Sequence, residues 1–257
     1  MNRLPPLDVH AHVNPKIDEL DLDSLNAAVF AVSRSLDEAA SAVERADRLT
    51  VWGVGCHPGL AEAEERFSAD RFSSLLDRSA LAGELGLDGK SPVPLAKQQQ
   101  VLRAALKVLR DKPRLVSLHS FRATEELITE LETTSLGGVV LHWWLGNAEQ
   151  TKRAIRLGAC FSVNSSSVRR RDILQRLPLD RVLTETDHPY GNHHGRGRAL
   201  KQPGSVGDVE AALAEHYATA PSEIRTAVWR NMGRLVAETR CSRLLPRSIR
   251  SHLAIVT

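Results

Sequence analysis

Cysteines are few in this sequence, and long apolar runs are absent. Among 257 residues only Cys56, Cys160 and Cys241 are cysteines, and their wide spacing matches neither a disulfide framework nor a zinc knuckle. No apolar stretch reaches the ~18 residues that a membrane-spanning helix needs, and the N-terminal MNRLPPLD shows no apolar signal-peptide core. We therefore expect a cytoplasmic protein with no membrane partner.

The sequence also lacks internal repeats, low-complexity tracts and serine- or glycine-rich linkers. Instead, short apolar segments alternate with helical patterns, as in βαβ units. The candidate strands are residues 6–10, 27–32, 49–54, 79–84, 114–118, 138–142, 158–163 and 180–185. The candidate helices are residues 35–46, 69–78, 95–111, 123–132, 147–156, 169–175 and about 221–239.

Eight strands of this kind predict a single α/β domain with a (β/α)8 TIM barrel, in which parallel strands are joined by right-handed crossovers. The alternative is an open doubly wound sheet, but such a sheet more often carries a glycine-rich phosphate loop after its first strand, and HAHVNPK has none. We assign residues 1–239 to the barrel. We interpret residues 240–257, with Arg243, Arg247 and Arg250 and no acid, as a peripheral basic extension.

Imidazoles and carboxylates recur where the candidate strands end. Asp8, His10 and His12 alternate in LDVHAHV, and side chains two apart on a strand share a face. Later segments carry similar residues, namely His57 in GCHP, Glu84 in GELGLD, His119 in LHSFRA, His142 in LHWWLG and Asp187 in ETDHP. We expect these groups to converge, because the C-terminal ends of barrel strands form one mouth.

Each of these residues alone has an ordinary structural explanation. A single histidine at a strand end is usually hydrogen-bonded or solvent-facing, and Glu84 or Asp187 could cap a turn or a helix. Together they indicate a metal site, because buried carboxylates are costly without compensation and divalent cations bind these donors. The donors suffice for one or two cations, and Mg²⁺, Mn²⁺ and Zn²⁺ all remain open. We expect Asp8 to lie behind the ligands and to orient a ligand histidine.

These motifs, together with RNMGRL near residue 231, resemble the TatD family of metal-dependent deoxyribonucleases over roughly residues 7 to 239. The resemblance implies a TIM barrel whose divalent cations are held by His10, His12, Glu84, His119, His142 and Asp187. It implies that Glu84 bridges two cations and that His57 lies near the substrate phosphate. For phosphodiester hydrolysis, Asp187 is expected to hold or deprotonate the nucleophilic water, so the predicted catalytic residues are Glu84, Asp187 and His57.

Two local features refine this resemblance. GELGLDG runs directly into KSP, which resembles TatD-like proteins of Qat anti-phage defence systems and implies a defence role with protein partners. Many relatives carry HCFSG where this chain has HWWLG. We expect one of Trp143 and Trp144 to be buried and the other partly exposed. An exposed Trp143 could stack on a nucleobase.

Positive charge follows several strands and indicates a polyanionic substrate. The arginines expected to bind substrate, with His57 and Trp143, are Arg122, Arg169, Arg170, Arg196 and Arg198. A solvated helix start is the alternative explanation for residues 169–171. The sequence has no helix-turn-helix or zinc-finger signature, so we expect binding to DNA without sequence specificity. The family resemblance implies a single-strand exonuclease.

Two other functions remain open from the sequence. A small-molecule amidohydrolase or phosphotriesterase-like esterase has a similar metal site, but many such barrels carry a carboxylated lysine where this chain has Glu84. A non-catalytic scaffold that depends on a partner is the third hypothesis. The presence of every expected ligand argues against it.

Overall fold

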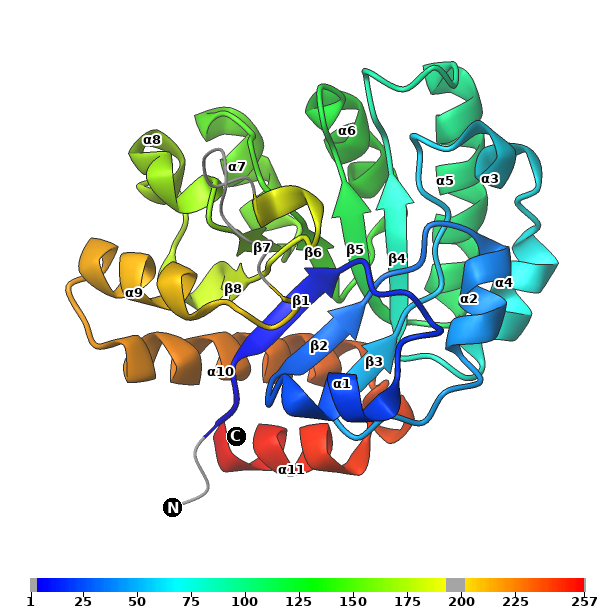
Figure 1. Ribbon diagram of the computed structural model, residues 1–257. Helices are drawn as coiled ribbons and strands as arrows, with labels where there is room; N and C mark the ends of the chain where they lie inside the picture. Colours follow the sequence, from blue (N-terminus) through cyan, green and yellow to red (C-terminus); the bar gives the residue numbers. More distant parts are fainter. Residues whose placement is uncertain (1–3, 193–201, 257) are drawn as a thin grey trace.

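The structure is a computed structural model that describes residues 4–192 and 202–256 (Figure 1). Its strands are β1 (Leu7–Ala11), β2 (Ala28–Ala31), β3 (Thr50–Trp52), β4 (Leu81–Gly86), β5 (Leu115–His119), β6 (Val139–Leu141), β7 (Cys160–Val163) and β8 (Val182–Thr184). All pairings are parallel, in the orders β1-β2-β3 and β4-β5-β6-β7-β8. Every expected strand is therefore present within a few residues of its expected position.

Backbone contacts join the two sheets into a closed barrel. Just beyond β3, Val54 forms a parallel bridge with Ala82 of β4. On the other side, the carbonyl of His10 accepts from the backbone N–H of Asp187 at 2.9 Å, and the N–H of His12 donates to the carbonyl of His188 at 2.8 Å. The expected (β/α)8 barrel is confirmed.

Helices surround the strands, as Figure 1 shows. They are α1 (Glu19–Ser24), α2 (Leu36–Ala42), α3 (Ala61–Glu65), α4 (Ala69–Leu76), α5 (Leu95–Asp111), α6 (Thr124–Thr134), α7 (Ala148–Arg156), α8 (Arg171–Leu174), α9 (Gly207–His216), α10 (Pro221–Thr239) and α11 (Arg247–Val256). Short 3-10 turns lie at Ser167–Arg169, Leu179–Arg181, Tyr190–Asn192 and Ser242–Leu244. Across residues 4–192 and 202–256, none of the helices combines the length and the apolar character needed to cross a membrane.

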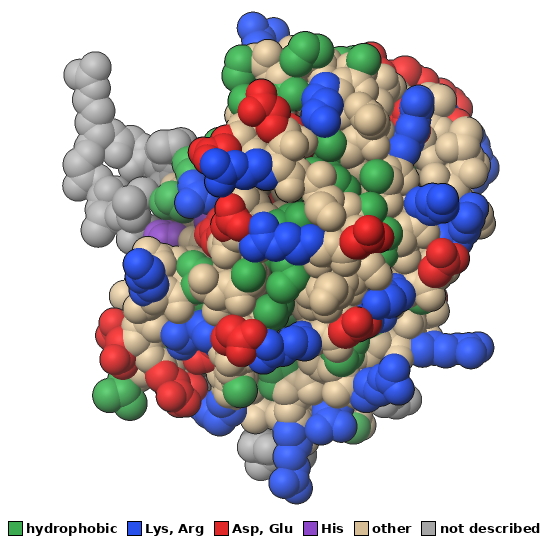
Figure 2. Space-filling view, turned by 90° about the vertical axis from the view of Figure 1, so that its right-hand side faces the viewer, with side chains coloured by type: hydrophobic (Ala, Val, Ile, Leu, Met, Phe, Trp, Pro, Cys, Tyr) green, Lys and Arg blue, Asp and Glu red, His purple; other side chains and the backbone are tan. Residues whose placement is uncertain are grey.

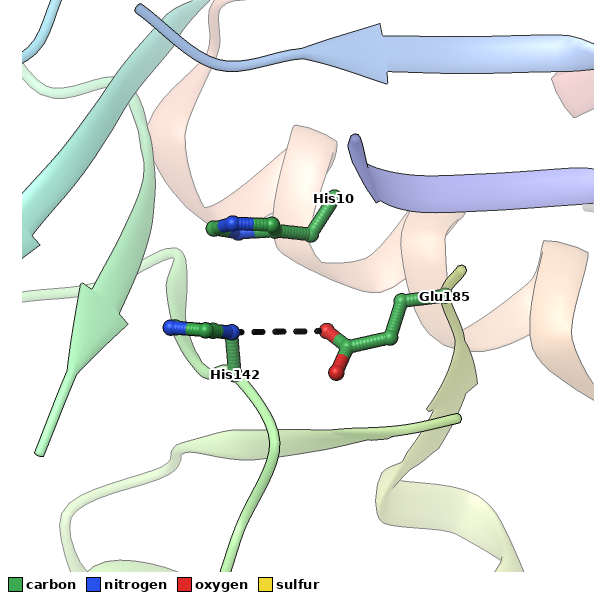
Figure 3. A group of neighbouring side chains, drawn as sticks. All are labelled: His10, His142 and Glu185. Atoms are coloured by element: carbon green, nitrogen blue, oxygen red, sulfur yellow. Dashed lines mark ion pairs between the residues drawn. The ribbon is translucent and has the colours of Figure 1, made fainter. Parts of the chain in front are cut away.

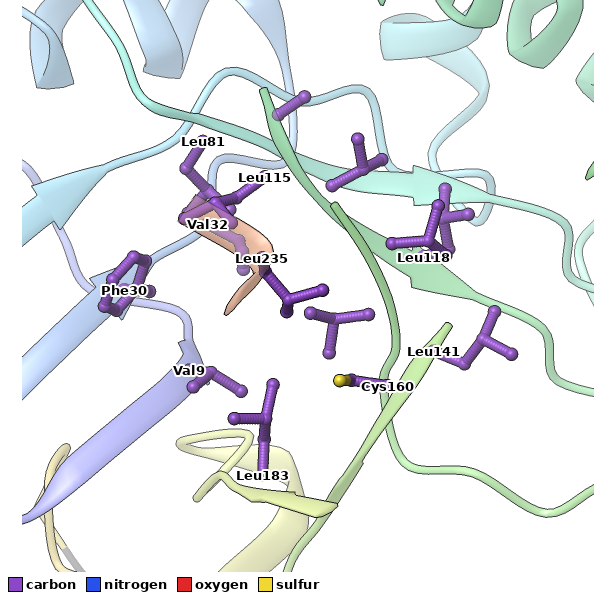
Figure 4. Close-up of a cluster of buried hydrophobic side chains, with 14 of the residues drawn as sticks. Val9, Phe30, Val32, Leu81, Leu115, Leu118, Leu141, Cys160, Leu183 and Leu235 are labelled. Carbon is purple, nitrogen blue, oxygen red and sulfur yellow. The ribbon is translucent and has the colours of Figure 1, made fainter. Parts of the chain in front are cut away.

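Helix α10 closes the N-terminal end of the barrel. Leu235 of α10 lies among buried strand residues that include Val9, Leu118 and Leu183 (Figure 4). Asn231, in the RNMGRL motif, anchors the helix through hydrogen bonds from Nδ2 to the carbonyls of Leu179 and Val182. Because this end is filled by side chains, the polar groups gather at the opposite, C-terminal end.

The segment after Arg240 contains a helix that the sequence analysis did not predict. Helix α11 packs on α10 and buries Ile249 and Leu253. The ring of His252 lies 5.5 Å from that of Trp229 in α10. The basic extension is therefore attached to the outside of the α10 plug.

The face beside α2, α4 and α5 carries charges of both signs, with Lys and Arg side chains intermixed with Asp and Glu (Figure 2). Arg71 of α4 pairs with Asp37 of α2 at 2.6 Å, and Lys112 after α5 pairs with Asp77 at 2.6 Å.

Candidate metal centre

The first strand departs from simple alternation. Asp8 pairs with Val29 and Ala11 with Ala31, so β1 contains one more residue than β2 over this interval. The irregularity turns His10 toward Ser117 and Glu84, while Asp8 contacts Thr186 and Gly204. The irregularity interrupts the expected alternation between Asp8 and His10, and the two side chains have different partners.

Glu84, at 1% exposure, lies between two sets of histidines. Its Oε1 is 2.9 Å from Nδ1 of His119 and 2.9 Å from Nε2 of His142. Its Oε2 is 3.2 Å from Nε2 of His12 and 3.7 Å from Nε2 of His10. Nε2 of His57 is also 3.5 Å from Oε2, so the two carboxylate oxygens face different imidazoles, as the oxygens of a bridging ligand do.

Asp187 completes the group around the first strand. Its Oδ1 lies 3.6 Å from Nε2 of both His10 and His12, and these three residues form a compact donor set. A second compact set contains His57, Glu84 and His119. The structure thus brings all six residues expected as ligands to one end of the barrel.

The spacing of these donors fits metal ions. A cation about 2.0–2.2 Å from its nitrogen and oxygen ligands separates neighbouring donors by roughly 3.0–3.5 Å. Several separations here fall in or near that range, and Nε2 of His10 and Oε2 of Glu84 are buried without a hydrogen-bond partner. Bound cations would satisfy these two atoms, so the residues present fit the expected ligand set.

Hydrogen bonds to the ring nitrogens separate the roles of His10 and His57. Nδ1 of His10 lies 2.7 Å from Oγ of Ser117, which leaves Nε2 directed at the carboxylates. Nδ1 of His57 accepts the backbone N–H of Gly59 at 2.8 Å, so a neutral His57 carries its proton on Nε2. That Nε2 points toward Glu84 at 3.5 Å as a donor, which suits contact with an anionic oxygen better than metal ligation.

Burial and mutual contacts shift the pKa values of the cluster. Burial lowers the pKa of His10 and that of His142. Burial opposes ionisation of Glu84, but the imidazoles of His57 and His142 hold its pKa well below the usual range. Burial and the nearby Glu84 raise the pKa of Asp187 to about 8. Positive charge between the carboxylates would relieve this repulsion, as a divalent cation does.

Glu185 is a buried member of the site that the sequence analysis missed. Its Oε2 lies 3.8 Å from Nδ1 of His142, whose ring stacks on that of His10 with centroids 3.9 Å apart (Figure 3). Its carboxylate also accepts from the hydroxyl of Ser162 and, at 3.0 Å, from the backbone N–H of Trp143. Glu185 therefore supports the turn that carries His142.

Asp8 supports the part of the metal centre formed by His10 and Asp187, mainly through hydrogen bonds from backbone N–H groups. It accepts from the N–H and the hydroxyl of Thr186 at 2.9 and 2.6 Å, and from the N–H of Gly204 at 2.8 Å. The backbone N–H of His10 lies 3.3 Å from its Oδ1. Asp8 thus holds the segment before Asp187 and the backbone of His10, and these contacts do not involve an imidazole.

A cavity of about 510 Å³ opens over the cluster. Its wall includes Arg122, Trp143 and Asp187. The backbone φ angles of these three residues are positive, at 52°, 42° and 45° in that order. Residues other than glycine rarely adopt a positive φ, because the Cβ atom crowds the backbone. Such residues concentrate at functional sites. As expected, one tryptophan is partly exposed and the other buried: Trp143 lies in the cavity wall and Trp144 is at 0% exposure.

Two of the remaining predicted substrate residues, Arg169 and Arg170, lie in the described part of the chain. Arg169 and Arg170 are exposed after β7 and are not among the described lining residues of the cavity, and Arg170 pairs with Asp172 at 3.4 Å. Arg196 and Arg198 lie outside the described residues. Contact of these arginines with a substrate stays a prediction.

Comparison with known proteins places the chain in a family. Residues 7–237 match the family model for TatD related DNase. A metal-dependent hydrolase of uncharacterised function from Escherichia coli, YjjV, is 30% identical over 190 residues, covering 69% of this chain and 73% of that protein. The crystal structure of YjjV superposes with a TM-score of 0.79 at 24% identity, covering 89% and 96% of the two chains.

Relatives with a named nuclease activity match a shorter region. The 3′–5′ ssDNA/RNA exonuclease TatD of Rahnella is 28% identical over 129 residues, which is 47% of this chain and 49% of that protein. On the strength of the family model and of YjjV, the chain belongs to the TatD related DNase family and is a metal-dependent hydrolase acting on ester bonds.

Proposed function

We propose that this protein is a divalent-metal-dependent 3′–5′ exonuclease that acts on single-stranded DNA. The observation that carries the proposal is the position of Glu84, whose two oxygens face different groups of imidazoles beneath an open cavity. The direction and the single-stranded substrate follow from the similarity to the Rahnella relative, a 3′–5′ ssDNA/RNA exonuclease. A cytoplasmic location is part of the proposal, and the free state of all three cysteines supports it.

In this proposal each group of the chain has a distinct task. His10, His12, Glu84, His119, His142 and Asp187 would hold one or two cations. When bound, these cations supply Lewis acidity at a phosphate oxygen and favour ionisation of water. The carboxylate of Asp187 would also hold or deprotonate the attacking water, and Nε2–H of His57 would donate to a phosphate oxygen. Arg122, exposed at the cavity wall, compensates the charge of the neighbouring phosphate.

The first experiment incubates metal-stripped protein with 5′-labelled single-stranded DNA, with and without Mg²⁺ or Mn²⁺. We expect metal-dependent shortening that retains the 5′ label, and no shortening by Glu84→Ala protein that circular dichroism shows to be folded. The absence of cleavage by a folded, metal-binding wild type would contradict the proposal. Hydrolysis of a generic phosphodiester without shortening of DNA would favour the small-molecule esterase.

We also propose a role in anti-phage defence with protein partners, because GELGLDGKSP resembles the Qat-encoded TatD-like proteins. This stretch lies beside the centre: Oδ2 of Asp88 is 3.4 Å from Nε2 of His119, and Ser91 donates to the carbonyl of Pro58. Phage plating on bacteria that carry the chain with its neighbouring genes tests the role. If bacteria that carry the Glu84→Ala variant are still protected from phage, the defence role does not depend on catalysis.

A further inference from the structure

Large apolar side chains are exposed at few places, and half of these places surround the cavity. Among the described residues, six such side chains are exposed, and Phe121 at 42%, Leu145 at 39% and Tyr190 at 47% all line it. Trp143 is partly exposed in the same wall. We call these four residues the apolar rim. Apolar groups gathered at a polar site usually mark a binding surface.

The rim residues come from three different loops and are held in place. Trp143 is fixed by its backbone bond to Glu185. The ring of Tyr190 meets the ring of His12 edge-on at 5.3 Å, and its hydroxyl lies 3.5 Å from Nη1 of Arg34. The guanidinium of Arg122 lies over the ring of Phe121, 5.6 Å from its centroid. Flat apolar surfaces thus stand beside positive charge.

Building on the proposed exonuclease function, we propose that the apolar rim is a base-stacking subsite. It takes the unpaired bases at the 3′ end of a strand while the adjacent phosphate reaches the metal centre. A nucleotide combines a flat apolar base with an anionic phosphate, and the site pairs an aromatic wall with Arg122 and the buried cluster. A small apolar ester would use the rim but leave Arg122 without a role.

The same arrangement selects single strands. Bases in a duplex stack on each other and are paired, so their faces are not available to aromatic side chains. The volume of about 510 Å³ lies within the range of roughly 300–1,000 Å³ that small-ligand pockets have, and suits individual nucleotides. Because every base has an aromatic face, such stacking tolerates any sequence.

Binding without metal isolates the rim from catalysis. Fluorescence anisotropy in EDTA compares a 5′-labelled strand with the same strand carrying two abasic sites at its 3′ end. Stacking is worth about 1–3 kcal/mol per base, so we expect the abasic strand to bind at least about fivefold more weakly. Phe121→Ala should weaken binding of the normal strand and leave the abasic strand unchanged. Leu20→Ala, an exposed position in α1, should change neither.

Tryptophan emission gives a second readout. Trp52, Trp144 and Trp229 are buried, so Trp143 is the tryptophan that a ligand can reach. The normal strand should quench emission more than the abasic strand, and Trp143→Phe should remove the difference while preserving affinity, because phenylalanine also stacks.

The outcomes separate the two proposals. Equal affinity for the normal and abasic strands, combined with metal-dependent shortening of DNA, would overturn the base-stacking subsite and leave the nuclease standing. Failure of the folded protein to bind either strand, combined with an absence of cleavage, would overturn both. Tighter binding of a blunt duplex than of the single strand would also overturn the subsite.

Discussion

Glu185 links the metal centre to the cavity wall. One end of its carboxylate approaches the ring of His142, and the other accepts the backbone N–H of Trp143. The carboxyl is fully buried, and burial together with Asp187 raises its pKa well above the usual range. At this single residue, the position of a metal ligand and the shape of the substrate site are coupled.

We expect Glu185→Gln to weaken Mn²⁺ binding by about tenfold or more, because loss of a group that orients a ligand typically costs 10–100-fold. Isothermal titration calorimetry measures the change, and thermal unfolding checks that the fold persists. Glu149→Gln, at a side chain with 67% exposure, is the matched control. Unchanged Mn²⁺ affinity in Glu185→Gln would show that the residue supports only the backbone of the turn.

The sequence identified the expected ligands but missed the groups behind them. Ser117 stands two residues before His119 on β5, and Glu185 stands two residues before Asp187 in the segment after β8. Neither residue is part of a motif that contains two histidines, and serine is too common for a single serine to indicate a functional site. Their roles depend on contacts across strands, such as Ser117 with His10, which spacing along one strand cannot reveal.

At the scale of elements, the two longest helices were predicted in full, whereas α1, α3, α9 and α11 were not predicted. Helices α5 and α10 begin and end at the predicted residues, because long runs of periodic apolar positions define them. Helices α1 and α3 span only 6 and 5 residues and carry mostly polar side chains. The irregularity in β1 was also unpredictable, because it depends on pairing with β2.

Helix α11 illustrates how tertiary contacts create an element. It buries Ile249 completely against the rest of the protein, while Ile255 on the same helix remains 52% exposed. We expect Ile249→Ala to lower the free energy of unfolding by about 2–5 kcal/mol, the usual cost of such a truncation in a core. Ile255→Ala should change it by less than about 0.5 kcal/mol.

Urea unfolding followed by circular dichroism measures both variants. Similar small effects for the two substitutions would mean that α11 does not contribute to the cooperative unit that unfolds. The contrast between two isoleucines on one helix excludes helix propensity as the cause, because the substitution is identical.

At the scale of the whole molecule, the candidate metal centre ties distant parts of the chain together. Its donors come from β1, β4 and β5 and from the segments after β1, β3, β6 and β8. A cation that binds the folded state alone stabilises it by about 2.7 kcal/mol at one hundred times its Kd. For a chain of this size, we expect saturating Mn²⁺ to raise Tm by about 5–10 °C.

Differential scanning calorimetry with EDTA or Mn²⁺ measures this shift. In Glu84→Gln the increase should be largely lost, because the two oxygens of Glu84 face His12, His119 and His142, which are expected to bind the cation. An equal increase in wild type and Glu84→Gln would place the stabilising ion elsewhere on the protein.

Because α10 closes the N-terminal end of the barrel, the barrel is open only at its C-terminal end. Leu235 fills the end opposite the cavity, so a strand cannot be threaded through the barrel as through a ring. For the proposed exonuclease, each excised nucleotide must leave by the opening through which the strand entered. The product then has to leave before the shortened strand can advance. Free mononucleotides are therefore expected to compete with DNA for the same cavity.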